Sequence, residues 1–175
     1  MALTKRSVIG AVIMLVAIIA IVGSTLGREI MAGRQPGLVS FGLIHFAGYL
    51  FFLLMPVEAL VPYYLAAGDS ALVLIGLSVG TALLAQTIDF AIGWFVSERV
   101  VDSLISRTKF EKFEATFSKW GGWAIFMMNL LPLSSPNMLL VSGIMRYSRL
   151  KALAISAGGL VLKYVVIVLL TDAVG

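Results

Sequence analysis

The residues of this sequence most able to do chemistry are polar side chains that stand inside long apolar stretches. Glu58 lies between two prolines in one such stretch, and Lys163 interrupts another. A charged side chain at membrane depth costs a few kcal/mol unless it is paired or hydrated, so it usually marks a substrate or ion site. The candidates for binding a substrate or an ion are Glu58, Gln86, Asp89, Asn129, Ser134, Ser135, Asn137 and Lys163.

Two of these candidates also have a purely structural interpretation. Glu58 and Lys163 would form an ion pair that only fixes helix packing. Asp89 stands a few turns before Glu98 and Arg99, where a headgroup region begins, so it is either functional or merely interfacial. Both interpretations stay open for each residue at this point.

The composition is that of a membrane protein. Apolar residues make up 60% of the 175 positions, and the mean hydropathy is +1.03. This exceeds what a soluble domain needs for its core. The small excess of 13 Lys and Arg over 9 Asp and Glu is typical of cytoplasmic loops and does not indicate nucleic-acid binding.

The sequence argues against enzymatic chemistry, metals and cofactors. It has no cysteine and one histidine, which excludes thiol catalysis and makes a conventional zinc site improbable. That histidine, His45, sits in the apolar stretch HFAGYLFF, where a hydrogen-bonded packing role is favoured over catalysis. No nucleophile stands beside a base and a cationic cradle, so we expect no enzyme and no cofactor.

These residues must be positioned by membrane-depth segments within a single domain, residues 1–175. Prolines break two of the segments, and irregular backbone at membrane depth is tolerated only where protein or a water-filled cavity covers it. Between them, five basic residues and several phenylalanines follow helical spacing, which predicts a helix lying on the membrane surface. The expected elements are transmembrane helices over 7–27, 70–96 and 152–170, re-entrant hairpins over 38–68 and 121–145, and an interfacial amphipathic helix over 98–119.

The two broken segments resemble each other. LMPVEALVPYYLAAG and LLPLSSPNMLLVSG each place a proline after apolar residues, a polar residue soon after it, and a later small pair that ends in glycine. The residues expected to shape the hairpins are Pro56, Pro62, Pro132, Pro136, Gly68 and Gly143. We therefore expect an all-α integral membrane protein of two inverted-topology repeats with broken-helix hairpins.

Charge predicts the orientation of these repeats. With the N-terminus inside and each hairpin returning to its own side, ten Lys and Arg residues fall inside and two, Arg28 and Arg34, fall outside. The hairpins then enter from opposite faces, and their tips meet near the midplane. This places the N-terminus and residues 98–119 in the cytoplasm. Gly76 and Gly80, at the small-xxx-small spacing, hint at helix association and a homo-oligomer.

The stretch WGGWAIFMMNLLPLSSPNMLLVSGIMRYSRLKAL resembles the DedA family, also called VTT or SNARE-associated membrane proteins. That family's signature is a Gly-Gly opening, an Arg-Phe-x-Pro-x-x-Arg core and a closing Ala-Gly. Pro132 takes the motif proline and Gly143 the closing glycine, while PVEALVPYYLAAG resembles the family's acidic first hairpin. The resemblance covers roughly residues 54–170.

This sequence departs from the family at its charged positions. Asn129 and Ser135 stand where the core motif has arginine, and Gln86 stands at the second acidic position, with Asp89 three residues later. Glu58 keeps the first acidic position. These replacements put the family's proton coupling in doubt and leave Lys163 or Arg146 to supply a cation for a phosphate, unless the substrate is zwitterionic.

The resemblance implies a protein of the cell membrane that moves lipids, because bacterial relatives are implicated in recycling the undecaprenyl phosphate carrier or in phospholipid transport, and eukaryotic relatives resemble scramblases. The implied partners are membrane lipids and a coupling ion, either a proton or sodium. The polar residues of facing hairpins would bind headgroups while acyl chains stay in the bilayer. The alternatives are a small-ion transporter, a membrane scaffold or assembly factor, and, less favoured, a lipid-phosphate enzyme.

Overall fold

The computed structural model describes residues 37–50, 57–103, 107–131 and 136–174, and every regular element in these ranges is a helix. The expected helix over 7–27 lies outside the described residues, as do Pro56, Pro132, Ser134 and Ser135. The elements are α2 (Leu38–Leu50), η1 (Val57–Ala59, a 3-10 turn), α3 (Leu60–Ala66), α4 (Ala71–Ser103), α5 (Arg107–Leu130), α6 (Pro136–Ile144) and α7 (Arg149–Val174). The expected all-helical class is confirmed for this part of the chain.

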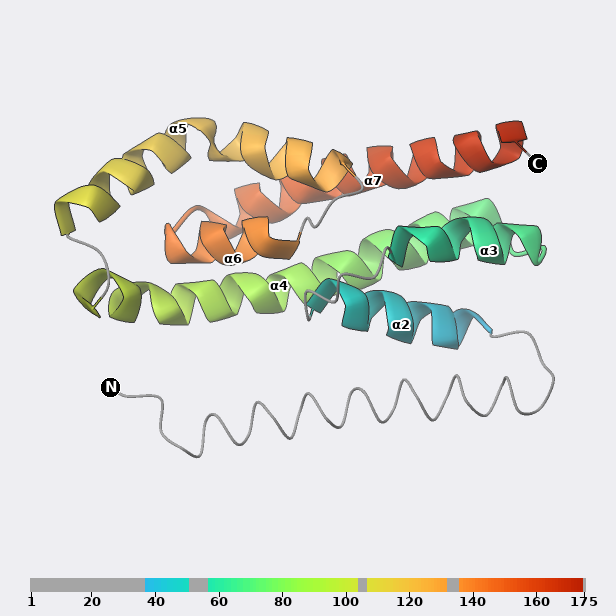
Figure 1. Cartoon of the computed structure of the whole chain (residues 1–175), viewed down its shortest axis with the longest axis horizontal. Coiled ribbons are helices and arrows are strands. Elements are labelled where there is room, and N and C mark those ends of the chain that lie inside the picture. The colour runs from blue at the N-terminus through green and yellow to red at the C-terminus, as the bar shows by residue number, and fades with distance from the viewer. Residues whose placement is uncertain (1–36, 51–56, 104–106, 132–135, 175) are drawn as a thin grey trace, which may run out of the picture.

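The two longest helices, α4 and α7, organise the bundle. They run in opposite directions along the length of the molecule and contact each other (Figure 1). α2 and α6 pack against α4, and α5 packs against α7. Within α4 and α7, Ala71–Phe95 and Arg149–Ala173 are each 25 residues long and apolar enough to cross a membrane. About 20 residues suffice for a hydrocarbon core ~30 Å thick.

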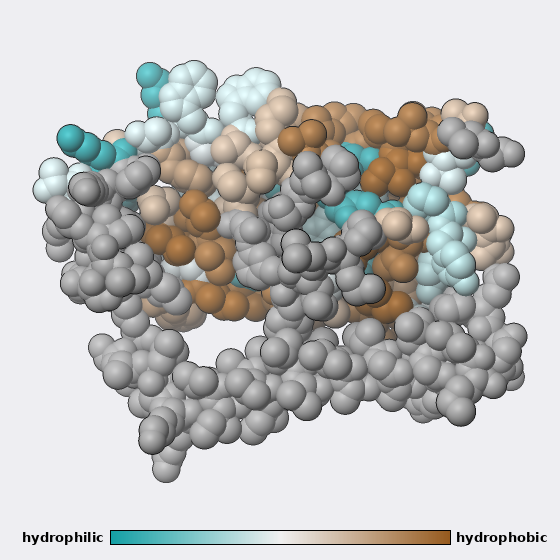
Figure 2. Space-filling view, in the orientation of Figure 1, coloured by the Kyte–Doolittle hydropathy of each residue, from teal (hydrophilic) through white to brown (hydrophobic). Residues whose placement is uncertain are grey.

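The surface of these two helices is apolar. Large side chains such as Leu72, Leu84, Phe95 and Leu169 are more than half exposed. Figure 2 shows hydrophobic residues over much of the described surface, with hydrophilic residues at the end where α5 begins, near the middle of this face and at the opposite end. A soluble monomer rarely exposes so much contiguous apolar area, so this surface supports membrane association.

The helix boundaries differ from expectation around residues 98–119. α4 continues past its expected end at residue 96 to Ser103, and α5 runs without a break to Leu130. The residues expected to form a separate helix are therefore divided between α4 and α5. Gly121 and Gly122 do not end α5, although each glycine in a helix costs about 1 kcal/mol. A Cβ at Gly122 would lie 3.2 Å from Cδ1 of Ile155, so the absent side chain lets α5 approach α7 closely.

One helix ends close to a predicted proline interruption. α5 ends at Leu130, Leu131 lies outside the helix, and α6 begins at Pro136. Pro62 lies in the first turn of α3, and Pro136 is the first residue of α6. A first turn tolerates proline because its backbone N–H groups have no partner within the helix.

The two short helices α3 and α6 end in the same kind of turn. After α3, Gly68 adopts φ +95° and its N–H bonds Leu65 O at 2.9 Å, while Asp69 N–H bonds Tyr64 O at 3.1 Å. This is the Schellman arrangement, in which one residue takes a left-handed conformation and a long helix follows.

After α6, the left-handed residue is Arg146 with φ 51°. Its N–H bonds Gly143 O at 3.1 Å, and Tyr147 N–H bonds Ser142 O at 2.9 Å. Gly143, which sequence comparison pairs with Gly68, therefore lies inside α6. A Cβ there would come within 2.2 Å of Phe90 O, so this glycine lets the backbones of α6 and α4 touch. The residue in the same left-handed position as Gly68 is therefore Arg146.

Candidate functional site

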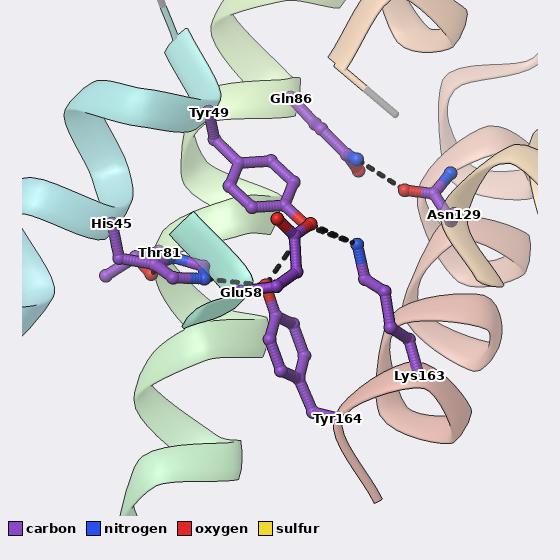
Figure 3. Close-up of polar contacts among 8 residues, drawn as sticks. All are labelled: His45, Tyr49, Glu58, Thr81, Gln86, Asn129, Lys163 and Tyr164. Atoms are coloured by element: carbon purple, nitrogen blue, oxygen red, sulfur yellow. Dashed lines mark hydrogen bonds and ion pairs between the residues drawn. The ribbon is translucent and has the colours of Figure 1, made fainter. Parts of the chain in front are cut away.

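A cluster of buried ionisable and hydroxyl side chains lies where α2, η1, α4 and α7 meet (Figure 3). We call it the charged cluster. Its members are His45, Tyr49, Glu58, Thr81, Lys163 and Tyr164. They come from four elements separated by up to 119 positions in the sequence, so the cluster exists only in the folded chain.

The centre of the charged cluster is an ion pair. Nζ of Lys163 lies 2.9 Å from Oε1 of Glu58, and the side chains are 2% and 15% exposed. The same Nζ donates to the Tyr49 hydroxyl at 2.7 Å and lies 5.3 Å from the ring centroids of Tyr49 and Tyr164. A carboxylate, a hydroxyl and two aromatic faces therefore compensate the buried ammonium.

A second part of the charged cluster extends from the ion pair to α4. The hydroxyls of Tyr49 and Tyr164 are 3.1 Å apart, and the Tyr164 hydroxyl lies 2.6 Å from Nε2 of His45. Nδ1 of His45 lies 2.8 Å from Oγ1 of Thr81. Both ring nitrogens of the fully buried histidine thus have hydrogen-bond partners, as the packing interpretation of His45 predicts.

Local sequence explains how the charged cluster is assembled. His45 and Tyr49 are four residues apart on α2, which places them on one helix face with their rings 4.9 Å apart. η1 is held against the same helix at Gly48, where a Cβ would come 2.2 Å from Cγ1 of Val57. This close approach carries the next residue, Glu58, toward the Tyr49 hydroxyl, to which it lies 3.4 Å away.

A second buried polar cluster lies between α4, α5 and α7, and we call it the amide cluster. Nε2 of Gln86 donates to Oδ1 of Asn129 at 2.6 Å, and the Ser156 hydroxyl donates to Oε1 of Gln86. Nδ2 of Asn129 donates to Ile125 O at 2.8 Å. Gln86, Asn129 and Ser156 are all fully buried, so every one of these neutral groups is used inside the protein.

A glycine also determines how closely the helices of the amide cluster approach each other. A Cβ at Gly159 would lie 2.8 Å from Phe126 O and 3.0 Å from Cβ of Asn129. The missing side chain lets α7 approach α5 at this level, which brings Asn129 within reach of Gln86 on α4. Figure 3 shows the Gln86 and Asn129 amides meeting across the bundle beside the charged cluster.

The structure brings together some of the predicted site residues and separates others. Glu58 meets Lys163, and Gln86 meets Asn129. Among the described residues, no hydrogen bond links one pair to the other, so the expected single polar site is divided into two. Asn137 belongs to α6, but its side chain is not among those described.

Asp89 lies inside the bundle on α4. It is 1% exposed, and its Oδ2 has no hydrogen-bond partner among the described residues. Ser78, on the same helix, has a buried hydroxyl in the same condition. Asp89 is therefore enclosed by neighbouring helices of the protein.

Four members of the clusters were not predicted. Tyr49, Tyr164, Thr81 and Ser156 occur in apolar stretches where an aromatic or a small hydroxyl residue usually means packing. Sequence signals point to two of them, Tyr49 and Ser156. Tyr49 follows His45 by one helical turn, and Ser156 precedes Lys163 by seven residues, which puts the last two on one face of α7.

Thr81 also reaches the surface of the bundle. It lines an apolar groove of about 600 Å³ between α2 and α4, together with Leu38, Gly42, Phe46, Leu77 and Leu84. The charged cluster therefore contacts this groove through Thr81. At the other end of the cluster, the side chain of Glu58 is 15% exposed.

The described residues hold no group of three His, Cys, Asp or Glu side chains placed to bind a metal ion. The chemistry that the charged cluster offers is instead the binding of a charged group and the transfer of a proton, because it joins an ammonium, a carboxylate, an imidazole and two phenols. Comparison of the chain with protein families, with characterised proteins and with solved structures finds no match.

Proposed function

We propose that this chain is a DedA-like membrane protein that moves lipids across the bilayer as a flippase or scramblase. The observation that carries the proposal is the buried Glu58–Lys163 pair beside two tyrosine hydroxyls, within a bundle whose α4 and α7 are long and apolar enough to cross a membrane. Charges held at membrane depth are costly and usually mark a transport path.

The chemistry of the charged cluster favours a zwitterionic phospholipid over a polyprenyl phosphate. Opening of the ion pair exposes one cation and one anion a few ångströms apart. The ammonium of Lys163 and the Tyr49 hydroxyl are donors for a phosphate, and the carboxylate of Glu58 is an acceptor for an amine. An anionic carrier phosphate would meet one cation and the repelling carboxylate.

The repeat architecture of the proposal has support from packing. α3 and α6 end in the same turn and lead into the two long antiparallel helices. The short helix α3 packs against α7, and α6 packs against α4, so each short helix lies on the long helix of the other half. We infer that α2 to α4 and α5 to α7 are inverted repeats with re-entrant hairpins, a common plan among transporters.

The remaining parts of the proposal follow from charge and surface. We place the protein in the cell membrane as a multi-pass protein, with the N-terminus and residues 98–119 cytoplasmic. No enzymatic step and no cofactor is involved. Gly76 and Gly80 are exposed on α4, and no described heavy atom lies within 4 Å of a Cβ at either, which suits a homo-oligomer contact.

Small-ion transport is the second candidate function. It is favoured by how tightly the charged cluster is closed, because Lys163 is 2% exposed and both tyrosines are buried. A proton or a small cation passes such a site with less rearrangement than a headgroup needs. A scaffold role would show itself as stable partners without any transport.

The test is headgroup-resolved lipid translocation in proteoliposomes of phosphatidylethanolamine and phosphatidylglycerol, with empty vesicles as the baseline. We expect the wild type to move phosphatidylethanolamine above the baseline and Glu58→Gln to fall to it, because the amine loses its anion. Asp172→Asn is the matched control, since Asp172 is an exposed carboxylate near the end of α7. Folded wild-type protein that moves no lipid would contradict the proposal.

A further inference from the structure

Tryptophan and basic side chains mark one boundary of the membrane on this bundle. Trp94 on α4 and Trp120 on α5 are both exposed. The Arg146 guanidinium lies 5.4 Å from the Trp94 ring, and Nζ of Lys119 lies 5.7 Å from the Trp120 ring. Tryptophan, lysine and arginine anchor a protein where the hydrocarbon of a bilayer meets the headgroups. For a protein that spans the membrane as proposed above, the level of Trp94 marks one face of the bilayer.

The other boundary lies near the start of α4. Ser70, the exposed residue before α4, is 24 positions from Trp94, which is ~36 Å along a continuous helix. That length covers a hydrocarbon core ~30 Å thick. α2 begins, α3 ends and α7 ends at this same end of the molecule (Figure 1). We call it the Ser70 end.

The apolar groove between α2 and α4 follows these helices from the Ser70 end toward the middle of the bundle. It is lined along α2 from Leu38 to Phe46 and along α4 from Val73 to Leu84. The two α4 residues are 11 positions apart, which is ~16 Å. Half of the hydrocarbon core, the part filled by the acyl chains of one leaflet, is ~15 Å thick. The groove is therefore one leaflet long and runs along a spanning helix.

The lining of the groove offers no hydrogen bond to a ligand. Thr81 is the one lining residue whose side chain carries a polar atom. Its hydroxyl lies 2.8 Å from Nδ1 of His45 and donates to Leu77 O at 2.7 Å. Its methyl carbon, Cγ2, is turned toward Gly42, another lining residue, and lies 3.9 Å from the position of a Cβ there. Burying a polar group without a partner is costly, so this surface suits hydrocarbon.

The width of the groove distinguishes a lipid chain from a helix. A groove of about 600 Å³ that is ~16 Å long has a mean cross-section of roughly 40 Å². An α-helix with its side chains is ~10–12 Å wide and occupies roughly 80–110 Å². A linear chain of methylene groups is thinner than a helix, so it fits where a helix does not.

We propose that the groove between α2 and α4 binds one acyl chain of a phospholipid from the leaflet at the Ser70 end. The methyl end of the chain reaches the level of Leu84 and lies against the methyl group of Thr81, whose hydroxyl belongs to the charged cluster. The inference rests on the proposed function for the position of α4 in a bilayer, and it adds the place where the lipid chain is held. Binding requires no movement of the lipid.

The first test maps depth with phospholipids that carry a photoreactive diazirine at one of two positions on an acyl chain. Proteoliposomes are irradiated, and the labelled residues are identified by mass spectrometry. We expect a diazirine near the glycerol to label Val39 and Val73, and a diazirine near the terminal methyl to label Leu84. Labelling of these residues that is no stronger than that of Leu169, an exposed residue of α7 outside the groove, would overturn the proposal.

The second test fills the groove. Gly42→Leu places a side chain between α2 and α4 without a backbone clash, because its Cβ meets Cγ2 of Thr81 at 3.9 Å, an ordinary contact distance. Gly158→Leu is the matched control on α7, outside the groove, where a Cβ lies 3.8 Å from Cε2 of Phe126. Gly42→Ala is a second, smaller change that remains informative if leucine prevents folding.

The expected effects follow from the methylene groups that each side chain displaces. We expect Gly42→Leu to lower groove labelling about tenfold, because it displaces about two methylene groups, and Gly42→Ala to lower it about threefold. Gly158→Leu should be labelled like the wild type. Equal groove labelling of the wild type and both Gly42 variants would overturn the proposal.

Other occupants of the groove would be detected by cysteine cross-linking, because the chain contains no cysteine. A disulfide between Ser24→Cys and Val73→Cys in one chain would show that residues 7–27 cover the groove. A disulfide between two chains that each carry only Val73→Cys would show a second copy there. Either result, together with absent groove labelling, would overturn the proposal.

Binding and transport can fail separately. Groove labelling should be the same for phosphatidylethanolamine and phosphatidylglycerol probes, because no polar group lines the groove, whereas translocation is expected to favour phosphatidylethanolamine. Translocation without groove labelling would overturn the acyl-chain site and leave the proposed function standing. Groove labelling that Gly42→Leu blocks, in a folded protein that moves no lipid, would support the site and contradict the proposed function.

Discussion

The charged cluster and the amide cluster lie side by side on the same two long helices, yet one is charged and partly exposed and the other is neutral and fully buried. α4 supplies Thr81 to one and Gln86 to the other, and α7 supplies Lys163 and Ser156, two helical turns apart. The two clusters differ in the third element that encloses them, which is α2 with η1 for the charged cluster and α5 for the amide cluster.

This third element determines whether the cluster is charged or neutral. α5 is a continuous helix at Asn129, and it closes the amide cluster with a neutral side chain whose hydrogen bonds are all internal. η1 is a short turn of three residues, and it closes the charged cluster with Glu58, whose side chain is 15% exposed. A fully satisfied neutral network favours a single arrangement, whereas the charged network contains an ion pair that the proposed transport requires to open.

The largest effect is expected where charge is forced into the neutral cluster. Asn129→Asp is isosteric, but it removes the donor to Ile125 O and places a carboxylate among fully buried neutral groups. The loss of unfolding free energy should be about 3–5 kcal/mol, the usual cost of an uncompensated buried charge. Titration with SDS in mixed micelles, followed by circular dichroism, measures it. A loss below about 1 kcal/mol would mean that water or a cation reaches this cluster.

The second prediction separates packing from function in the charged cluster. Lys163→Met should lower the unfolding free energy by about 3 kcal/mol, because it strands the Glu58 carboxylate next to buried rings. Lys163→Met combined with Glu58→Leu should recover most of that loss, because an apolar pair often replaces a buried ion pair without cost.

The double variant should nevertheless move no lipid in proteoliposomes, and SDS titration and translocation are measured on the same preparations. If the double variant stays as unstable as the single one, the ion pair fixes helix packing. If it is stable and still transports, neither charge acts in transport.

The sequence predicts much of this arrangement through strong physical signals. A charge in an apolar stretch must find a partner, and Glu58 and Lys163 indeed form the ion pair that was one of the two interpretations of these residues. The end of α5 at Leu130 agrees with the interruption predicted at Pro132. Gln86 and Asn129, both singled out as site candidates, are bonded to each other.

Other features depend on tertiary contacts that no local pattern encodes. Tyr49 and Tyr164 resemble ordinary apolar packing residues until the fold places their hydroxyls together. Arg146 takes a left-handed conformation that usually belongs to glycine, and its guanidinium lies 5.4 Å from the Trp94 ring. The division of residues 98–119 between α4 and α5 was missed because the basic and aromatic pattern there is compatible with one continuous amphipathic helix.

The smallest effect is expected from Ser156→Ala, which tests whether the amide cluster is only structural. The change removes one donor to Gln86 on the face of α7 that also carries Lys163, and leaves the bond from Gln86 to Asn129 in place. The unfolding free energy should fall by about 1 kcal/mol, the net value of one buried hydrogen bond, as measured by SDS titration. Lipid translocation should not change, because no charge is touched. If translocation is lost while stability falls this little, the amide cluster belongs to the lipid path, and the two clusters work as one site.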